Sequence, residues 1–284
     1  MKLFLDTADL DHIREAVSWG IIDGVTTNPS LIKKAAESLR TSGESMDMES
    51  YIKNILAIAG RTRPVSLEVA GITADEMFEQ GMFLFETFNP VAGNVVIKIP
   101  VCTVTSKGEG DPFDGITAIE RLDEERVPVN ATLIFTPEQA LLAAKAGADY
   151  VSPFAGRIDD RIRTAAGLTF GKADYFPIEG MEHPEKAGCT LNDCGLVSGV
   201  DLVSEMVMIF EEYEIEAEIL AASIRNPIQV RELAVAGADI ATMPFDVLRS
   251  MVMHPGTANG IDSFTADLVD EYLAIFRKKG KAKK

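Results

Sequence analysis

The sequence predicts an α/β protein built as a single (β/α)8 TIM barrel, a closed ring of parallel strands with a helix after each. Eight short runs rich in β-branched residues recur along the chain, and each precedes a segment with helical spacing of its apolar residues. The runs are continuously apolar rather than alternating, which is typical of parallel strands covered by helices. Such a barrel takes roughly 250 residues as one domain, so we expect one domain over residues 1–284.

The expected strands are short, and the intervals between them leave room for a helix and its turns. They lie, in chain order, within residues 2–8, 24–30, 64–71, 94–101, 127–135, 149–157, 217–225 and 239–247. Two of the intervening helices end alike, because "AAKAGADYVSPF" and "LAVAGADIATMPF" each place a glycine, Gly147 or Gly237, just before the next strand. Glycine caps a helix in the left-handed conformation, so this echo indicates a repeated βα unit.

Two stretches interrupt the rhythm. Residues 105–115, "TSKGEGDPFDG", follow the fourth strand, and a polar, glycine-containing insertion, residues 158–200, follows the sixth. Both should leave the carboxyl ends of strands, where barrel enzymes carry their catalytic loops, so each is a candidate lid or specificity loop. After the barrel we expect a C-terminal helix and a basic tail, residues 262–284, with an apolar stripe that covers its own barrel or packs against a neighbouring subunit.

Composition argues against several classes of function. The chain has 44 acidic and 27 basic residues, a formal net charge of −17, which repels the phosphates of nucleic acids and anionic membranes. No apolar run is long enough for a membrane span, and Asp6 follows the amino terminus too closely for a signal sequence. With three cysteines, an odd and sparse set, we expect a cytoplasmic protein that binds neither nucleic acid nor membrane.

The first candidate catalytic residue is Lys98, which stands among valines and isoleucines in "NVVIKIPV". A mid-strand lysine that faced the apolar helix layer would bury its charge at a large cost, so Lys98 should point into the barrel. Desolvation there favours the neutral amine, the form that attacks a carbonyl to make a Schiff base. A second interpretation stays open, in which the ammonium reaches the barrel mouth or pairs with an acidic side chain.

Polar side chains also stand in other strands where apolar ones are expected. Because the carboxyl ends of barrel strands converge, polar residues on seven strands describe a hydrophilic pocket for a polyhydroxylated ligand. For single members a structural role stays open: Asn28 before Pro29 can shape a turn, and Thr132 is an ordinary strand residue. With Lys98, the set is Asp6, Thr26, Asn28, Glu68, Asn130, Thr132, Ser152, Ser223 and Arg225.

Seven sequence motifs resemble those of the transaldolase family, in particular its short branch that includes the fructose-6-phosphate aldolases. They run in the family's order along the barrel part of the chain, and "GVTTNPS" together with "IKIP" is a specific pair. The motifs are "LFLDTAD", "GVTTNPSLI", "LEVAG", "VVIKIP", "VNATLIF", "YVSPFAGRIDD" and "AASIRN".

The resemblance implies a cofactor-free Schiff-base enzyme that moves a dihydroxyacetone unit from a ketose phosphate. Lys98 matches the family's lysine that attacks the C2 carbonyl, and Asp6 of the "LDT" motif matches its proton shuttle at the C4 hydroxyl. Glu68 and Thr132 match the positions that hold a catalytic water. These four residues are the expected catalytic set.

The resemblance also implies the residues that bind the substrate. Hydrogen bonds to the three-carbon unit are expected from Asn28, Asn130 and Ser152, and phosphate contacts from the constellation of "FAGR" and "SIR". For Arg157 an ion pair with Asp159 or Asp160 is the alternative. The positions expected to bind substrate are Thr26, Asn28, Asn130, Ser152, Phe154, Arg157, Ser223 and Arg225.

Two positions favour transfer over simple cleavage. Phe154 and Glu68 look like the transaldolase residues, where the fructose-6-phosphate aldolases tend to carry tyrosine and glutamine. Without the extra proton donor the enamine waits for an aldehyde acceptor. The two interruptions leave the substrate open, so an aldolase, or a transaldolase acting on a sulfonated or longer-chain sugar, is an alternative. A barrel that only binds sugar phosphate is a non-enzymatic one.

We expect no cofactor and no metal. His183, Cys189 and Cys194 in the insertion are too few and too widely spaced for a metal site. The short transaldolases form ring-like oligomers through a terminal helix, so the resemblance implies a homo-oligomer. The expected partners are therefore sugar-phosphate substrates and further copies of the chain.

Overall fold

Eight parallel strands close into a barrel in the order β1-β10-β9-β6-β5-β4-β3-β2. The protein is described by a computed structural model that covers residues 1–42, 47–184 and 186–279. Every strand expected from the sequence is present, and the (β/α)8 fold class is confirmed. The barrel strands are β1 (Lys2–Asp6), β2 (Gly24–Thr26), β3 (Val65–Glu68), β4 (Val95–Pro100), β5 (Val129–Ile134), β6 (Tyr150–Pro153), β9 (Glu218–Ala221) and β10 (Ile240–Met243).

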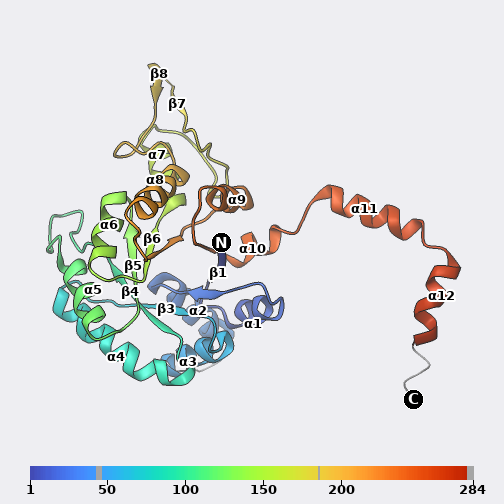
Figure 1. Ribbon diagram of the computed structural model, residues 1–284, viewed down its shortest axis with the longest axis horizontal. Coiled ribbons are helices and arrows are strands. Elements are labelled where there is room, and N and C mark those ends of the chain that lie inside the picture. Colours follow the sequence, from blue (N-terminus) through green and yellow to red (C-terminus); the bar gives the residue numbers. More distant parts are fainter. Residues whose placement is uncertain (43–46, 185, 280–284) are drawn as a thin grey trace. The chain divides into compact units, whose positions relative to one another are not determined.

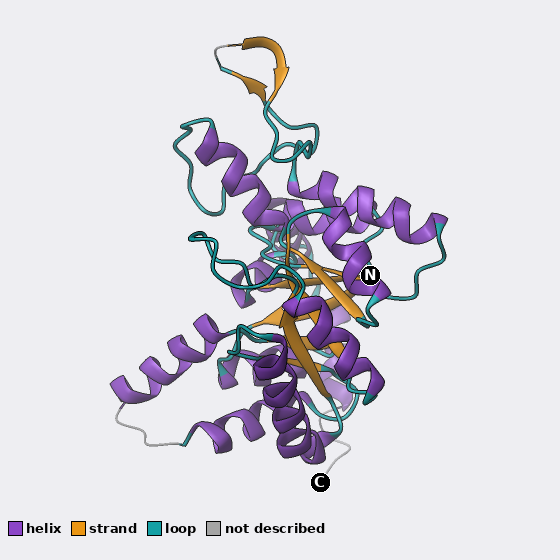
Figure 2. Ribbon diagram, turned by 90° about the vertical axis from the view of Figure 1, so that its left-hand side faces the viewer, coloured by secondary structure: helices purple, strands orange, loops and turns teal. Residues whose placement is uncertain are grey.

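Helices surround these strands, as Figures 1 and 2 show. Their boundaries follow local signals: a capping box of Thr73 and Glu76 begins α4, and Gly147 and Gly237, at φ of 97° and 93°, follow the ends of α6 and α9. The helices of the barrel unit are α1 (Leu10–Ser18), α2 (Pro29–Ser42), α3 (Met48–Ala59), α4 (Ala74–Ala92), α5 (Asp114–Glu124), α6 (Pro137–Lys145), α7 (Ala155–Ala165), α8 (Gly199–Glu212), α9 (Pro227–Val235) and α10 (Phe245–Ser250), whose end reaches past this unit.

Strand register decides which side chains meet inside the barrel. Glu68 on β3 is level with Lys98 on β4, and Lys98 is level with Asn130 on β5. On the other side, Asp6 at the end of β1 is level with Thr26 on β2. Residues that are level on adjacent parallel strands point to the same side of the sheet, so the register gathers these polar groups at one end of the barrel.

The insertion after β6 is shorter than the expected 158–200. Helix α7 continues to Ala165 and α8 begins at Gly199, so the irregular segment is 166–198 and carries a small hairpin of β7 (Glu182–His183) and β8 (Lys186–Thr190), which stands away from the barrel strands in Figure 1. The polar composition of residues 158–165 suggested a loop, although they belong to α7. Asp159 and Arg163 of this helix are buried and hydrogen-bonded rather than solvated. Glu185 and its structure lie outside the described residues.

The chain forms two compact units, Met1–Leu248 with the barrel and Arg249–Lys284 after it. Where one C-terminal helix was expected, the described part of the second unit has two, α11 (Pro255–Ala266) and α12 (Asp270–Lys279). The acidic Asp270 and Glu271 favour a new helix start at that point, because negative charge is stabilising near a helix N-terminus. The last five residues of the expected basic tail, 280–284, lie outside the described residues.

Candidate active site

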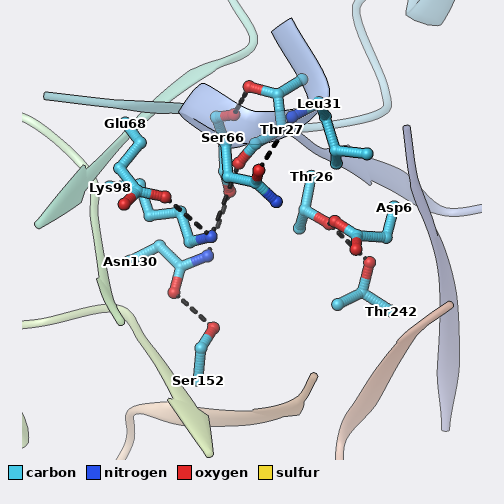
Figure 3. Close-up of polar contacts among 11 residues, drawn as sticks. Asp6, Thr26, Thr27, Leu31, Ser66, Glu68, Lys98, Asn130, Ser152 and Thr242 are labelled. Carbon is cyan, nitrogen blue, oxygen red and sulfur yellow. Dashed lines mark hydrogen bonds and ion pairs between the residues drawn. The ribbon is translucent and has the colours of Figure 1, made fainter. Parts of the chain in front are cut away.

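A lysine lies at the centre of the polar pocket inside the barrel. Lys98 is 5% exposed, and its ammonium Nζ lies 3.1 Å from Glu68 Oε2 and 3.5 Å from the carbonyl oxygen of Thr27. Its other four strand neighbours from Val95 to Ile99 are buried apolar residues. The side chain points inward, and of the arrangements left open by the sequence it adopts the ion pair with an acid (Figure 3).

Asp6 presents a second carboxylate to the same pocket, from β1. Thr26 donates a hydrogen bond to Asp6 Oδ1 at 2.8 Å, and the Thr26 hydroxyl also meets the Thr242 hydroxyl at 2.6 Å (Figure 3). Burial raises the pKa of the Asp6 carboxyl, and the charge of Lys98 and the hydrogen bond from Thr26 oppose the shift only in part. A carboxyl that holds its proton more readily than an exposed aspartate is suited to both taking and returning a proton.

A chain of hydrogen bonds lines the pocket beside Lys98. Ser152 donates to Asn130 Oδ1 at 2.7 Å, and Asn130 Nδ2 donates to the Ser66 hydroxyl at 3.1 Å (Figure 3). Thr132 is fully buried, and its hydroxyl has no hydrogen-bond partner among the described residues. A buried, unsatisfied hydroxyl is costly, so this group is suited to holding a small polar molecule such as water.

Asn28 serves a structural purpose as well. Its side-chain oxygen accepts the Leu31 N–H at 3.0 Å, which caps the first turn of α2. The residue also lines the pocket, and its side-chain amide has N–H donors that the cap does not use. The turn-forming interpretation and the binding interpretation are therefore compatible.

The other end of the pocket is cationic. The ring of Phe154 lies near two cations, with its centre 6.0 Å from Lys98 Nζ and 4.8 Å from the guanidinium carbon of Arg157. Arg225 and Ser223 complete this end, and Ser223 adopts a left-handed backbone with φ of 63°. The N-cap residue of α7 is Phe154, whose side chain has no polar group and makes no cap hydrogen bond, so the start of this helix is suited to an anion.

Close packing brings α7 against the loop that carries the arginine. A Cβ at Gly156 would collide with the carbonyl oxygen of Ser223 and with the side chain of Arg225. Only glycine allows this approach, which places the start of α7 beside both residues. The sequence motifs "FAGR" and "SIR" are thus joined in space by Gly156.

Arg225 donates hydrogen bonds to two acceptors that the sequence analysis did not pair with it. Its guanidinium Nη2 donates to Asp160 Oδ2 at 2.6 Å, and its backbone N–H donates to Gln229 Oε1 at 2.9 Å. Gln229 Nε2 in turn donates to the buried Asp159, whose pKa burial raises to about 7. Asp160 therefore forms its ion pair with Arg225. It does not form the alternative ion pair with Arg157.

The cavity has a volume of about 420 Å³. Nine of the twelve expected site residues line it, while Glu68, Asn130 and Thr132 lie behind and act on it through contacts or burial. The sequence analysis missed several lining residues, among them Thr242, which carried a signal as a polar residue within the eighth strand. Two lysines that were also missed line the pocket: Lys34 of α2, and Lys172 of the 166–198 segment. Residues 105–115 are not among the lining residues.

Two further observations concern sites elsewhere. Within the described ranges no group of three or more His, Cys, Asp or Glu side chains is arranged to hold a metal ion, and all three cysteines are unpaired. In the same ranges, no helix has the length and apolar composition needed to cross a membrane.

The fold and the pocket define a TIM-barrel protein with a lysine-centred polar site, and sequence comparison identifies its family. Residues 3–282 match the family described as Transaldolase/Fructose-6-phosphate aldolase. The chain belongs to this family, as its motifs indicated.

Curated relatives of similar length carry one name. Proteins named "Probable transaldolase" from Hydrogenobaculum sp., Methanococcus maripaludis and Thermoplasma acidophilum are 42%, 41% and 39% identical over 267 residues. Each alignment covers 94% of this chain and 96%, 97% and 95% of the respective relative. Among solved structures, a thiamine phosphate pyrophosphorylase from Pyrococcus furiosus aligns with a TM-score of 0.44 and 14% identity over 86% of this chain and 85% of its own, a likeness too weak to carry an argument.

Proposed function

We propose that this member of the transaldolase family transfers a dihydroxyacetone unit from a ketose phosphate, of the fructose 6-phosphate or sedoheptulose 7-phosphate type, to an aldose phosphate through a Schiff base on Lys98. The observation that carries the proposal is the buried Lys98 amine beside Glu68, in a pocket that also contains the Asp6 carboxyl. A nucleophilic amine, an adjacent base and a proton shuttle are the groups that this chemistry needs.

The reaction begins at Lys98. A proton passes from the Lys98 ammonium to Glu68, the neutral amine adds to the C2 carbonyl, and Glu68 returns the proton to the oxygen that leaves as water, which gives a protonated Schiff base. Asp6 then takes the proton of the C4 hydroxyl, the C3–C4 bond breaks, and its electron pair enters the iminium to give an enamine while C4 departs as an aldehyde. The enamine attacks the acceptor aldehyde, Asp6 returns the proton to the new hydroxyl, and water releases the product ketose from Lys98.

Glu68 and Thr132 are assigned to the proton transfers at the Schiff-base centre. Glu68 is the acceptor nearest the amine, and the buried Thr132 hydroxyl, unsatisfied within the described residues, supports the assignment of a water between them. Thr26 orients the Asp6 carboxyl through its hydrogen bond. Each assignment follows from a contact or an unpaired atom and from the family's motif.

Substrate binding divides along the pocket. Asn28, Asn130 and Ser152 are assigned to the hydroxyl groups of the three-carbon unit, because Asn28 and Ser152 line the cavity and Asn130 is hydrogen-bonded to Ser152. At the cationic end Arg157 and Arg225 are assigned to the phosphate, as guanidinium groups bind phosphate in two-point contacts. Ser223, which also lines the pocket, adds a hydroxyl donor.

Transfer is favoured over cleavage by the residue beside the amine. The ring centre of Phe154 lies 6.0 Å from Lys98 Nζ. Because Phe154 has no hydroxyl group, it offers no proton to an enamine on Lys98. An enamine that is protonated slowly persists until an acceptor arrives. The aldolase, the modified-sugar transaldolase and the inactive sugar-phosphate-binding barrel remain the competing functions.

The location and assembly follow from this proposal. A transaldolase of carbohydrate metabolism, serving the pentose phosphate pathway, belongs in the cytoplasm. We also assign a homo-oligomer, because the second unit buries no side chain of α11 and its apolar residues need another surface to cover them. We assign one domain to the chain, since none of the described residues after Leu248 is buried and the second unit therefore shows no core of its own there.

The test follows release of glyceraldehyde 3-phosphate from fructose 6-phosphate with and without erythrose 4-phosphate. Release that depends on the acceptor supports transaldolase, whereas equal release without it identifies an aldolase. Lys98→Met is the matched variant, and borohydride reduction with fructose 6-phosphate should attach a sugar fragment to the wild-type chain and none to the variant. Activity retained by Lys98→Met would refute the mechanism, and no activity in wild type would favour another sugar or a binding protein.

A further inference from the structure

Arg225, at the cationic end of the pocket, forms an ion pair with the acidic side chain of Asp160. Asp160 Oδ2 lies 2.6 Å from Arg225 Nη2, and the side chains are 26% and 14% exposed. Arg225 lines the pocket, and Arg225 and Asp160 both line a second hollow bounded by α7 and by Asn192 and Asp193 of the insertion. The two charges are thus neighbours at the border of the site.

The ion pair uses only part of each group. Arg225 Nε and Asp160 Oδ1 are both buried and have no hydrogen-bond partner within the described ranges. The contact is therefore a single end-on bond rather than the two-point pairing that arginine and carboxylate form when both are free to align. The guanidinium retains donors for an anion, whereas a carboxylate of Asp160 partly neutralises its charge.

The position of Arg225 does not depend on Asp160 alone. Gln229 accepts the Arg225 backbone N–H at 2.9 Å and is itself held by Asp159 at 2.8 Å. Gly156 packs against the Arg225 side chain from the first turn of α7. Replacing the Asp160 carboxylate by an amide therefore changes mainly the charge beside the guanidinium.

We propose that Asp160 is an internal counter-anion that competes with the substrate's phosphate for Arg225 and so sets the affinity of this subsite. The inference rests on the proposed function, since it takes Arg225 as a phosphate ligand. In the free protein the carboxylate stabilises a mostly buried guanidinium, and in the complex it repels the phosphate dianion. Both effects weaken phosphate binding, because the first stabilises the free state and the second destabilises the bound state.

The consequence for the reaction is faster exchange of phosphorylated sugars. A transaldolase must release one sugar phosphate and accept another while the enamine stays on Lys98. A carboxylate that returns to Arg225 as the phosphate leaves lowers the affinity that would otherwise delay this step. Sugars without a phosphate make no contact with Arg225 through such a group, so their binding should not depend on Asp160.

The experiment measures binding of inorganic phosphate by isothermal titration and by the phosphate-induced rise in melting temperature. Asp160→Asn keeps a hydrogen-bond acceptor and removes the charge, and it should bind phosphate about tenfold more tightly than wild type. Asp193→Asn is the control, because Asp193 pairs with the neighbouring Arg161 of α7 at a similar side-chain exposure of 20%. That variant should bind phosphate as wild type does.

A further variant separates failure of this inference from failure of the phosphate site. Arg225→Gln should lose most phosphate binding, and if it does not, the assignment of Arg225 to the phosphate is wrong. If Arg225→Gln loses binding but Asp160→Asn binds phosphate no more tightly than wild type, the counter-anion role alone is overturned. An equal gain in Asp193→Asn would also overturn it, since the effect would then be one of overall charge.

Discussion

Removing the amine of Lys98 should destabilise the protein as well as abolish its chemistry. In Lys98→Met the Glu68 carboxylate loses the partner that lies 3.1 Å away, with side chains only 6% and 13% exposed in the pair. Two unit charges at that distance interact by about 5 kcal/mol at an effective dielectric constant of about 20. Relaxation of the surroundings recovers part of this, so the expected loss of unfolding free energy is about 3 kcal/mol.

The loss is large enough to measure by thermal unfolding. At about 2.1 cal/mol/K per residue, a chain of 284 residues unfolds with an entropy of about 0.6 kcal/mol/K, so the melting temperature should fall by about 5 °C. The double variant Lys98→Met/Glu68→Gln removes both charges and should regain most of that difference. Lys2→Met is the control, because the exposed Lys2–Glu218 pair should contribute less than about 1 kcal/mol.

Two results would refute this reasoning. A Lys98→Met variant with the melting temperature of wild type would mean that the pair contributes nothing to stability. A double variant no more stable than Lys98→Met would place the loss in packing rather than in an unpaired carboxylate.

Three further outcomes are expected. Burial raises the pKa of Asp6, and the hydrogen bond from Thr26 opposes that rise. Thr26→Val removes this hydrogen bond, so the pKa of Asp6 should rise further and the acid limb of kcat/KM should move to higher pH. A shift to lower pH would contradict the shuttle assignment. Asp159 has a folded pKa of about 7, above its unfolded value of 3.8, so its contribution should lower the free energy of unfolding as pH rises from about 4 to about 7, by up to about 4 kcal/mol. Denaturant titrations of Asp159→Asn should lack this slope, and an equal slope would place it elsewhere. A chain that ends at Leu248 should keep the barrel and sediment as a monomer, and assembly like the full chain's would exclude the second unit as the interface.

The local sequence pattern was sufficient to predict each feature that depends on a single strand. All eight strands were predicted, because a buried parallel strand has a continuous apolar run that helices cover. Most of the polar exceptions in those runs, Lys98, Asp6 and Thr26 among them, line the cavity, since a polar side chain aimed at the helix layer would be too costly. Local reasoning was wrong where buried polar groups imitate a loop, as at the end of α7.

The sequence alone was therefore enough to predict the barrel, its family and nine of the residues that line the pocket. Only the tertiary structure decided the pairings: that Lys98 meets Glu68 from the adjacent strand, and that Asp160 meets Arg225, which lies 65 positions along the chain. The physical reason is that burial depends on short-range pattern, whereas an ion pair depends on distances of a few ångströms between distant segments. Those distances are set by strand register and by the close approach at Gly156, which no local pattern encodes.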